Sequence, residues 1–297
     1  MRKIFLCPLR IKENYDFFIC LSKGVGQIML QENAITGLLF LLGIFLTSWV
    51  MGLAALLAAA VGTLTAFVLK FDKERTKQGL YGFSAALVGV GLTLYFQPLV
   101  WVWMAIVVGS IAATILQNYF FNKKIPVFTL PFVLVTWLFI YIFRNLYVIE
   151  ATEIFLAPLV KMQDFTFAFR GIGQVIFQGS IFAGIIFFIG IFIHSPVAAL
   201  YGLSAAVVAG ALSAWAGAPS EAIAMGLFSY NAVLSAIVFS GNKRSDGAWA
   251  LIAVVLSVII SMLMYQYDLV QLTFPFVLAT GLTLILKKLA TALKFQR

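Results

Sequence analysis

The sequence predicts an all-α polytopic membrane protein made of two inverted repeats, and three observations support this fold class. The chain is 63% hydrophobic and 10% charged, with a mean hydropathy of +1.04, whereas soluble domains carry about 45–50% apolar and about 25% charged residues. Long apolar runs approach the roughly 20 residues that a membrane-spanning helix needs. An internal duplication relates the two halves of the chain.

The apolar runs and the basic residues together predict how the chain lies in a membrane. Examples of the runs are residues 51–69, 99–116 and 248–264. Basic residues lie in the tails and the short connectors, which is the pattern that sets orientation. Because both tails are basic, we expect both termini in the cytoplasm and an even number of full crossings. We therefore attribute the net charge of +9 to the basic residues that orient the chain in the membrane, and we expect no nucleic acid partner.

Two blocks of the duplication recur with the same spacing. A glutamine block begins at Gly24 (GVGQIMLQENAITGLLFLLGIF) and recurs at Gly171, 147 positions later, as GIGQVIFQGSIFAGIIFFIGIF. A glycine-rich block begins at Gly79 (GLYGFSAAL) and recurs at Gly226, again 147 positions later, as GLFSYNAVL. Chance apolar similarity would not keep glutamine and glycine in register, so the blocks indicate a duplicated unit.

The duplication also predicts how the chain is divided. Each repeat is expected to hold about five spanning helices and one re-entrant helix, and an odd number of crossings inverts the second repeat. The short glycine-rich segments 79–96 and 226–239 suit helices that enter the membrane and return, which is tolerated where the backbone is buried or lines a wet cavity. The expected parts are a cytoplasmic tail 1–23, a first repeat 24–150, a connector 151–170, a second repeat 171–288 and a cytoplasmic tail 289–297.

A pair of glutamines, Gln27 and Gln174, occupies the same position of the repeated block, each within Gly-x-Gly-Gln. A glutamine amide offers one acceptor and two donors, and burying it without partners costs free energy. A single such residue would more often link neighbouring membrane helices. Two at symmetric positions favour side chains that line a solute path, because inverted repeats place that path at their interface.

A third block places a threonine two residues before a proline in each half. It is TLPFVLVTW from Thr129 and TFPFVLATG from Thr273, 144 positions later. Proline has no backbone N–H, so Pro131 and Pro275 lie either inside a helix, which frees a carbonyl, or in its first turn, beside a threonine cap. A single copy would be a routine proline kink. Two symmetric copies favour paired threonines that face one path.

Two phenylalanines, Phe83 and Phe177, differ from the other aromatic residues because each falls within a repeated block. Phe177 follows Gln174 by three residues, so both share one helix face. Ring faces beside amide and carbonyl acceptors suit a small planar solute, because the rings exclude bulk while the oxygens replace lost water.

Ionisable and reactive groups are scarce in the apolar runs, which disfavours several function classes. Intramembrane charges mark ion pathways and proton relays, so their scarcity favours passive movement of a neutral solute. The sequence has no HExxH or GxSxG motif and no acid pair in a span, so we expect no enzymatic activity. An ammonium channel would be expected to show paired histidines, whereas His194 stands alone. Cys7 and Cys20 have no CxxC spacing, so we expect no metal and no cofactor.

The three blocks resemble the urea transporter family. Both glutamine blocks, both glycine-rich segments and both Thr-x-Pro-Phe phrases occur in order, so the resemblance covers about residues 24–286. It implies two inverted halves of five spans, each with a re-entrant helix, around one central pore in each protomer. It also implies a homotrimer with separate pores that conduct urea passively.

The resemblance also implies which residues form the pore, and they come in symmetric pairs. Gln27 and Gln174 correspond to the polar residues of the filter's outer and inner sites, and Thr129 and Thr273 to the threonines at its narrow middle. The remaining positions are the filter-wall leucines Leu87 and Leu234, the apolar wall residues Ile28 and Val175, and the aromatic slot positions Leu30, Phe83, Phe177 and Tyr230.

Two slot positions depart from the family, which usually has phenylalanine at all four. Leu30 would give one wall a softer face, and Tyr230 adds a hydroxyl that needs a partner. Ser84 also stands where asparagine is common, although Asn231 is kept in the second half. We therefore expect a passive urea channel with a narrow, uncharged selectivity filter, surrounded by lipid in the cytoplasmic membrane. The alternative is a pore of the same fold for another small neutral solute, such as a short amide.

Overall fold

Every regular element is a helix in the part of the chain that this computed structural model describes, residues 8–152 and 165–295. The first half holds α1 (Pro8–Gly26), the 3-10 helix η1 (Gln27–Met29), α2 (Ala34–Thr47), α3 (Trp49–Val68), α4 (Lys73–Lys77), α5 (Phe83–Tyr95), α6 (Val100–Asn122), α7 (Leu130–Tyr141) and the π-helix η2 (Ile142–Leu146). The second half holds α8 (Thr166–Gln174), α9 (Ile181–His194), α10 (Pro196–Trp215), α11 (Ser220–Ala224), α12 (Tyr230–Val238), α13 (Arg244–Gln266) and α14 (Phe274–Phe295).

The two halves repeat one another helix by helix. Helices α2, α3 and α4 recur 147 residues later as α9, α10 and α11, and α6 recurs 144 residues later as α13. The caps recur too. The Ser48 hydroxyl accepts a hydrogen bond from the backbone N–H of Met51 at the start of α3, and Ser195 accepts one from Ala198 at the start of α10. Such caps satisfy the free donors of a helix start, so the duplication extends to individual helix ends.

Unusual backbone conformations are duplicated as well. Non-glycine residues rarely have positive φ angles, so their recurrence at matching positions reflects a shared fold of the two halves. The positive-φ residues of the described chain all fall into symmetric pairs, which are Leu30 and Phe177, Lys70 and Gly217, Gly79 and Gly226, Lys124 and Asp268, and Phe128 and Leu272.

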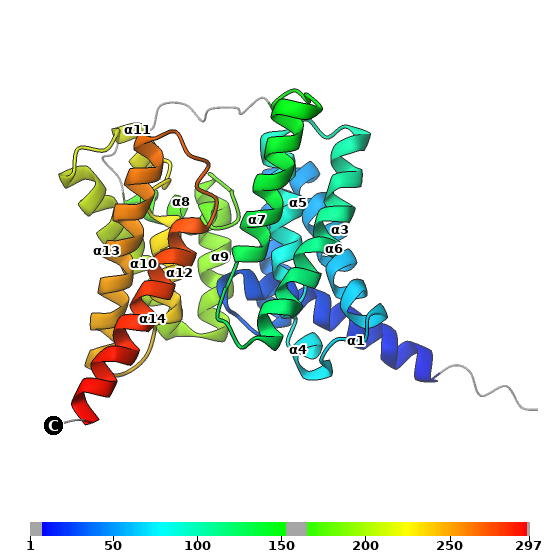
Figure 1. Ribbon diagram of the computed structural model, residues 1–297, viewed down its shortest axis with the longest axis horizontal. Helices are drawn as coiled ribbons and strands as arrows, with labels where there is room; N and C mark the ends of the chain where they lie inside the picture. Colours follow the sequence, from blue (N-terminus) through cyan, green and yellow to red (C-terminus); the bar gives the residue numbers. More distant parts are fainter. Residues whose placement is uncertain (1–7, 153–164, 296–297) are drawn as a thin grey trace, which may run out of the picture.

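The second half is inverted relative to the first. In Figure 1 the short helices α4 and α11 lie at opposite ends of the molecule. Helices α7 and α14 both begin near its middle and run toward opposite ends. Helix α1 and the last turns of α14 lie toward the end that holds α4 (Figure 1). Inverted halves of this kind place a solute path between them.

The helices have the length and composition of a polytopic membrane protein, which confirms the predicted fold class. Within the described residues, α3, α6, α10, α13 and residues 274–293 of α14 are long and apolar enough to cross a membrane. A sixth span results if residues 17–29 and α2, which meet at a 74° bend, count as one. Helices α5, α7 and α9 are apolar but shorter. The count of about five crossings in each half stays a prediction.

The halves pack against each other through a symmetric pair of phenylalanines. The rings of Phe40 on α2 and Phe187 on α9 lie 5.1 Å apart, edge to face, and both are fully buried. Each ring faces a glycine of the other half, Phe187 against Gly43 and Phe40 against Gly190. The Thr36 hydroxyl adds a hydrogen bond of 2.7 Å to the carbonyl oxygen of Gly190. Small residues let the two helices approach closely, as in other membrane helix pairs.

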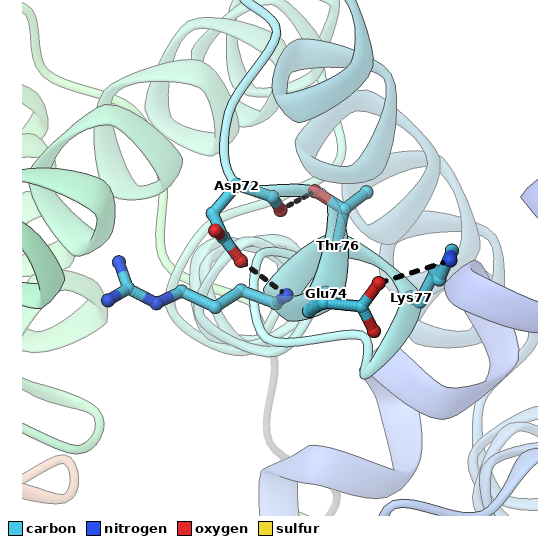
Figure 2. Close-up of polar contacts among 5 residues, drawn as sticks. Asp72, Glu74, Thr76 and Lys77 are labelled. Carbon is cyan, nitrogen blue, oxygen red and sulfur yellow. Dashed lines mark hydrogen bonds and ion pairs between the residues drawn. The ribbon is translucent and has the colours of Figure 1, made fainter.

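Short helix α4 is fixed by its own polar residues. Figure 2 shows the Asp72 carboxylate accepting a hydrogen bond of 2.9 Å from the backbone N–H of Arg75, and the Thr76 hydroxyl donating to the carbonyl oxygen of Asp72 at 2.7 Å. Glu74 and Lys77 form an exposed ion pair of 3.2 Å. The side-chain cap at Asp72 satisfies a free donor of the helix start, and the turn brings Arg75 to the rim of a cavity described below.

Three helices cross the expected divisions of the chain. Helix α1 begins at Pro8 and continues through the division at 23/24, and α8 begins at Thr166, inside the expected connector. Helix α14 continues through the division at 288/289. Residues 1–7, most of the connector (153–164) and residues 296–297 lie outside the described residues.

Candidate functional site

The two threonines of the Thr-x-Pro-Phe phrases meet where the two halves come together. Their hydroxyl oxygens lie 2.6 Å apart, and both residues are buried. Thr129 is the cap residue of α7 and Thr273 immediately precedes α14, so each proline lies in a first turn and not inside a helix. The carbonyl oxygens of Val127 and Gln271 are therefore not freed by a kink, because they accept hydrogen bonds from Leu130 and Phe274.

A left-handed residue before each threonine produces this meeting. Phe128 has a φ of 48° and Leu272 a φ of 44°. Each turns the chain sharply at the point where a connector ends and a helix begins. The result is that two helix starts, and the hydroxyls beside them, face each other across the interface between the halves.

The two glutamines occupy matching positions and bond in the same way. The Gln27 amide nitrogen donates to the carbonyl oxygen of Gln78 at 3.0 Å, and Gln174 donates to the carbonyl oxygen of Met225 at 3.2 Å. Both side chains are half-buried. Because backbone takes one N–H of each amide, the amide oxygen and the second N–H are left to meet a solute.

The glycines of the repeated blocks make these hydrogen bonds possible. A side-chain carbon at Gly79 would lie 2.4 Å from the backbone nitrogen of Gly24, and one at Gly226 would lie 2.4 Å from that of Gly171. Gly79 and Gly226 also have φ angles of 78° and 75°, which glycine adopts without strain. The contact therefore brings the helix that carries each glutamine against the turn that accepts its hydrogen bond.

A cavity of about 500 Å³ opens beside the first-half residues. It is deep enough to reach one of the central threonines. Its walls include the predicted residues Gln27, Ile28, Leu30, Phe83 and Thr129. The structure therefore brings five of the six first-half members of the predicted set together around one cavity, Leu87 being the exception, and the second-half members do not line it.

The rim and inner wall of this cavity include residues that the sequence analysis did not name. Arg75 and Lys124 contribute positive charge, and Phe276 reaches in from the second half. The ring of Phe276 lies 5.2 Å from that of Phe128, another wall residue. A usable signal existed for Phe276, because it is the phenylalanine of the second Thr-x-Pro-Phe phrase.

Two second-half members of the predicted set, Phe177 and Tyr230, contact residues within or next to the threonine phrases. Phe177 is the left-handed residue that matches Leu30, and its ring lies 6.0 Å from that of Phe132. Tyr230 is buried at the start of α12, and its hydroxyl donates a hydrogen bond of 2.6 Å to the carbonyl oxygen of Leu272. The tyrosine hydroxyl thus has the partner that it needs.

The wall residues of the prediction are among the least exposed of the chain. Leu87 on α5 and Leu234 on α12 are fully buried, as is Val175. Ile28 is 1% exposed and lines the cavity. The central region is therefore apolar around a few polar groups, which is how small-molecule sites are usually built.

This arrangement can accept a small neutral molecule better than an ion. The threonine hydroxyls, the glutamine amides and a few carbonyl oxygens are the polar groups near the centre, and no grouping of three metal-ligating side chains occurs within the described ranges. The threonine pair carries no charge, so a charged solute that left water at that point would lose its hydration without a counter-ion. A neutral molecule with N–H donors could exchange water for amide, hydroxyl and carbonyl oxygens.

Comparisons with a family model and with individual proteins both find urea transporters. A family model described as "Urea transporter" matches residues 19–288. The chain is 27% identical over 294 residues to Urea transporter 1 of Ovis aries, which covers 89% of this chain and 75% of that protein. It is 26% identical over 300 residues to Urea transporter 1 of Rattus norvegicus, with 91% and 77% covered.

Proposed function

Because the chain belongs to the urea transporter family, we propose that it transports urea across a membrane, passively and through a narrow uncharged filter between its two halves. The contact between the Thr129 and Thr273 hydroxyls is the observation that best supports a filter at this place. It joins two inverted helix starts at the inner end of a cavity that also contains Gln27.

Urea is neutral, planar and rich in N–H donors, and the proposed path offers acceptors in sequence. Urea would enter the cavity beside the amide oxygen of Gln27, pass the ring of Phe83, and reach Thr129. At the threonine pair it would replace the hydrogen bond between the two hydroxyls with bonds of its own. Gln174 and Phe177 would receive it on the other side. Each exchange avoids the cost of leaving a buried polar group unpaired.

A short amide is the second candidate solute, and the hydrogen bond made by Tyr230 supports it. The Tyr230 hydroxyl already occupies the carbonyl oxygen of Leu272, so one acceptor beside Thr273 is shared before any solute arrives. Leu30, which lines the cavity, replaces a flat aromatic ring with an aliphatic side chain. Such a wall selects less strictly for planar solutes. A solute with fewer donors than urea would lose less at such a site.

Stopped-flow light scattering on proteoliposomes tests the proposal. Purified protein would be challenged with urea, acetamide, formamide and glycerol at equal osmolarity, and empty liposomes give the background. Saturable urea entry that is faster than entry of the other three solutes, and independent of membrane potential, is expected. Faster acetamide than urea entry would assign the pore to amides, and background rates for all four solutes would contradict transport.

Orientation, localisation and assembly complete the proposal. The end of the molecule that holds α4 would face the cytoplasm, because basic residues such as Lys73, Arg75 and Lys77 lie there. Both termini would then be cytoplasmic, in the cytoplasmic membrane. A homotrimer with one pore in each protomer is implied by the family. Mass measurement in detergent and labelling of engineered cysteines from each side test these expectations.

A further inference from the structure

We infer that the guanidinium of Arg170 forms a binding site for a small planar oxyanion, such as a carboxylate or bicarbonate, in the second half beside Gln174. Arg170 lies on α8, one helical turn before Gln174. Its effect on transport rests on the proposed function, whereas its binding of the anion does not.

Arg170 is a buried cation that forms no ion pair with any residue that the structure describes. The residue is 7% exposed, and among the described residues its guanidinium donates through Nη1 alone, in a long hydrogen bond of 3.4 Å to the carbonyl oxygen of Gly179 and in one of 3.4 Å to the sulfur of Met225. Its Nε atom is buried without a hydrogen-bond partner. The ion pairs found among the described residues involve other cations. A buried charge in this state is costly unless something pairs with it.

The first half shows what is missing. The residue that matches Arg170, 147 positions earlier, is Lys23, and its ammonium pairs with Glu32 at 3.0 Å. The residue that matches Glu32 is Gly179. The second half has therefore kept the cation, buried it more deeply and lost the carboxylate. The lost group was a planar oxyanion on a side chain, so a free planar oxyanion suits the same place.

The place left by that carboxylate lies against the proposed path. A side-chain carbon at Gly179 would meet the amide nitrogen of Gln174 at 3.3 Å and the methyl carbon of Met225 at 3.0 Å. Gln174 itself donates to the carbonyl oxygen of Met225. An anion between Arg170 and Gly179 would therefore lie within reach of the Gln174 amide, and would change how that amide meets a solute.

The geometry of the cation favours an oxyanion over a spherical ion. A guanidinium presents its N–H donors in a planar fork that matches the two oxygens of a carboxylate. Nη1 makes one long contact to an oxygen and one to a sulfur, and Nη2 donates to no described residue, so the fork that these two atoms form is available to a carboxylate beside Gly179. Chloride cannot accept from both arms of the fork in the same way.

Thermal unfolding of the detergent-solubilised protein tests binding without any transport assay. The probe is sodium formate, compared with sodium chloride and with bulky sodium gluconate at equal ionic strength. Formate is expected to raise the Tm of the wild type by about 2 °C or more over gluconate, since a ligand that binds only the folded state stabilises it. A rise of the same size with chloride would overturn the planar oxyanion, and no rise with formate would overturn the site.

Two variants locate the effect. Arg170→Gln removes the cation, and Gly179→Glu supplies the carboxylate found in the first half, where the neighbouring atoms are ends of flexible side chains. Both are expected to abolish the formate effect. Arg144→Gln, at an exposed arginine, is the matched control and should keep it. A formate effect that persists in Gly179→Glu overturns the assignment even if Arg170→Gln fails to fold.

Urea entry into proteoliposomes then measures the consequence. With formate on both sides of the membrane, the rate of urea entry through the wild type is expected to fall by about twofold or more relative to the rate without formate. The rate through Gly179→Glu is expected to be the same with and without formate. If the wild type does not transport urea, the proposed function fails while the Tm result still decides the anion site. If formate binds but leaves urea entry unaffected, the link between the site and the path is wrong.

Discussion

The hydroxyl oxygens of Thr129 and Thr273 lie 2.6 Å apart, although 144 residues separate them in the chain. Each hydroxyl is the other's partner, and both residues are buried. The pair links the starts of α7 and α14, which run in opposite directions. This hydrogen bond therefore helps to join the two halves, and under the proposed function it marks the point that a solute would pass.

Replacement of both threonines by valine should destabilise the protein by less than the sum of the two single replacements. Thr129→Val leaves the Thr273 hydroxyl buried without a partner, which costs about 1–2 kcal/mol, and Thr273→Val is equivalent. The double variant removes both hydroxyls, so its loss should be smaller than the sum of the single losses. Thermal unfolding in detergent of the four proteins of this cycle measures the coupling.

Thr136→Val is the matched control for that cycle. Its hydroxyl on α7 is fully buried and already lacks a partner. Its removal should therefore leave the free energy of unfolding unchanged or raise it. Additive losses from Thr129→Val and Thr273→Val would show that the two hydroxyls are not coupled. Urea entry should fall in the double variant even where its stability is restored.

Alanine at either glutamine should slow urea entry roughly tenfold. A urea molecule that has shed its water would then have an N–H donor without an acceptor at that position, which costs about 1–3 kcal/mol. Gln27→Ala and Gln174→Ala remove the amide oxygens on the two sides of the threonine pair. Stopped-flow light scattering with equal amounts of reconstituted protein measures the rates. Gln97→Ala, which breaks an exposed bond to Glu150, is the control. Wild-type rates in both variants would remove the glutamines from the path.

The duplicated positions were predictable from the sequence because the repeat keeps polar residues in register. Gln27 with Gln174 and Thr129 with Thr273 needed only an alignment of the chain with itself, and the contact between the threonines agrees with the expectation that they share a location. The left-handed turns at Phe128 and Leu272 were not predictable, because phenylalanine and leucine rarely adopt that conformation. The tertiary packing imposes it.

Differences between the halves were harder to predict than their likeness. The positive charge at the first-half cavity comes from Arg75 and Lys124, which lie outside the repeated blocks. Arg170 falls inside the expected connector, so the division of the chain left it out of the second repeat. A comparison of Arg170 with Lys23, and of Gly179 with Glu32, would have revealed the missing carboxylate.

Tyr230→Phe should change solute preference. The variant frees the carbonyl oxygen of Leu272 from its hydrogen bond of 2.6 Å, and leaves only the longer contact from Asn231 at 3.3 Å. An added acceptor beside Thr273 favours the solute with more N–H donors. The ratio of urea to acetamide entry is expected to rise about two- to tenfold, the equivalent of one net hydrogen bond.

Tyr201→Phe is the control for that change. Its hydroxyl also donates to a backbone carbonyl, that of Gly241 at 3.0 Å, but it does so away from the threonine pair. Its removal should leave the ratio of entry rates as in the wild type. An unchanged ratio in Tyr230→Phe would mean that the Leu272 carbonyl oxygen does not face the solute.

Alanine at the interface glycines should loosen the contact between the halves. A methyl group at position 43 would lie 2.5 Å from a ring carbon of Phe187, and one at position 190 would lie 3.0 Å from a ring carbon of Phe40. Overpacking of this kind costs about 1–3 kcal/mol, and the shorter distance predicts the larger loss for Gly43→Ala. Gly281→Ala, on α14 with no atom in its way, should instead be neutral or stabilising by about 0.5–1 kcal/mol.

The same variants separate packing from conduction. The Thr129–Thr273 hydrogen bond depends on how the halves are placed, so Gly43→Ala should alter urea entry as well as Tm, although residue 43 does not line the cavity. A second change, Phe187→Leu, removes ring atoms from the crowded place and should recover part of the lost Tm, because volume-conserving combinations are tolerated best. If Gly43→Ala lowers neither Tm nor urea entry, the α2–α9 contact does not hold the two helix starts in place.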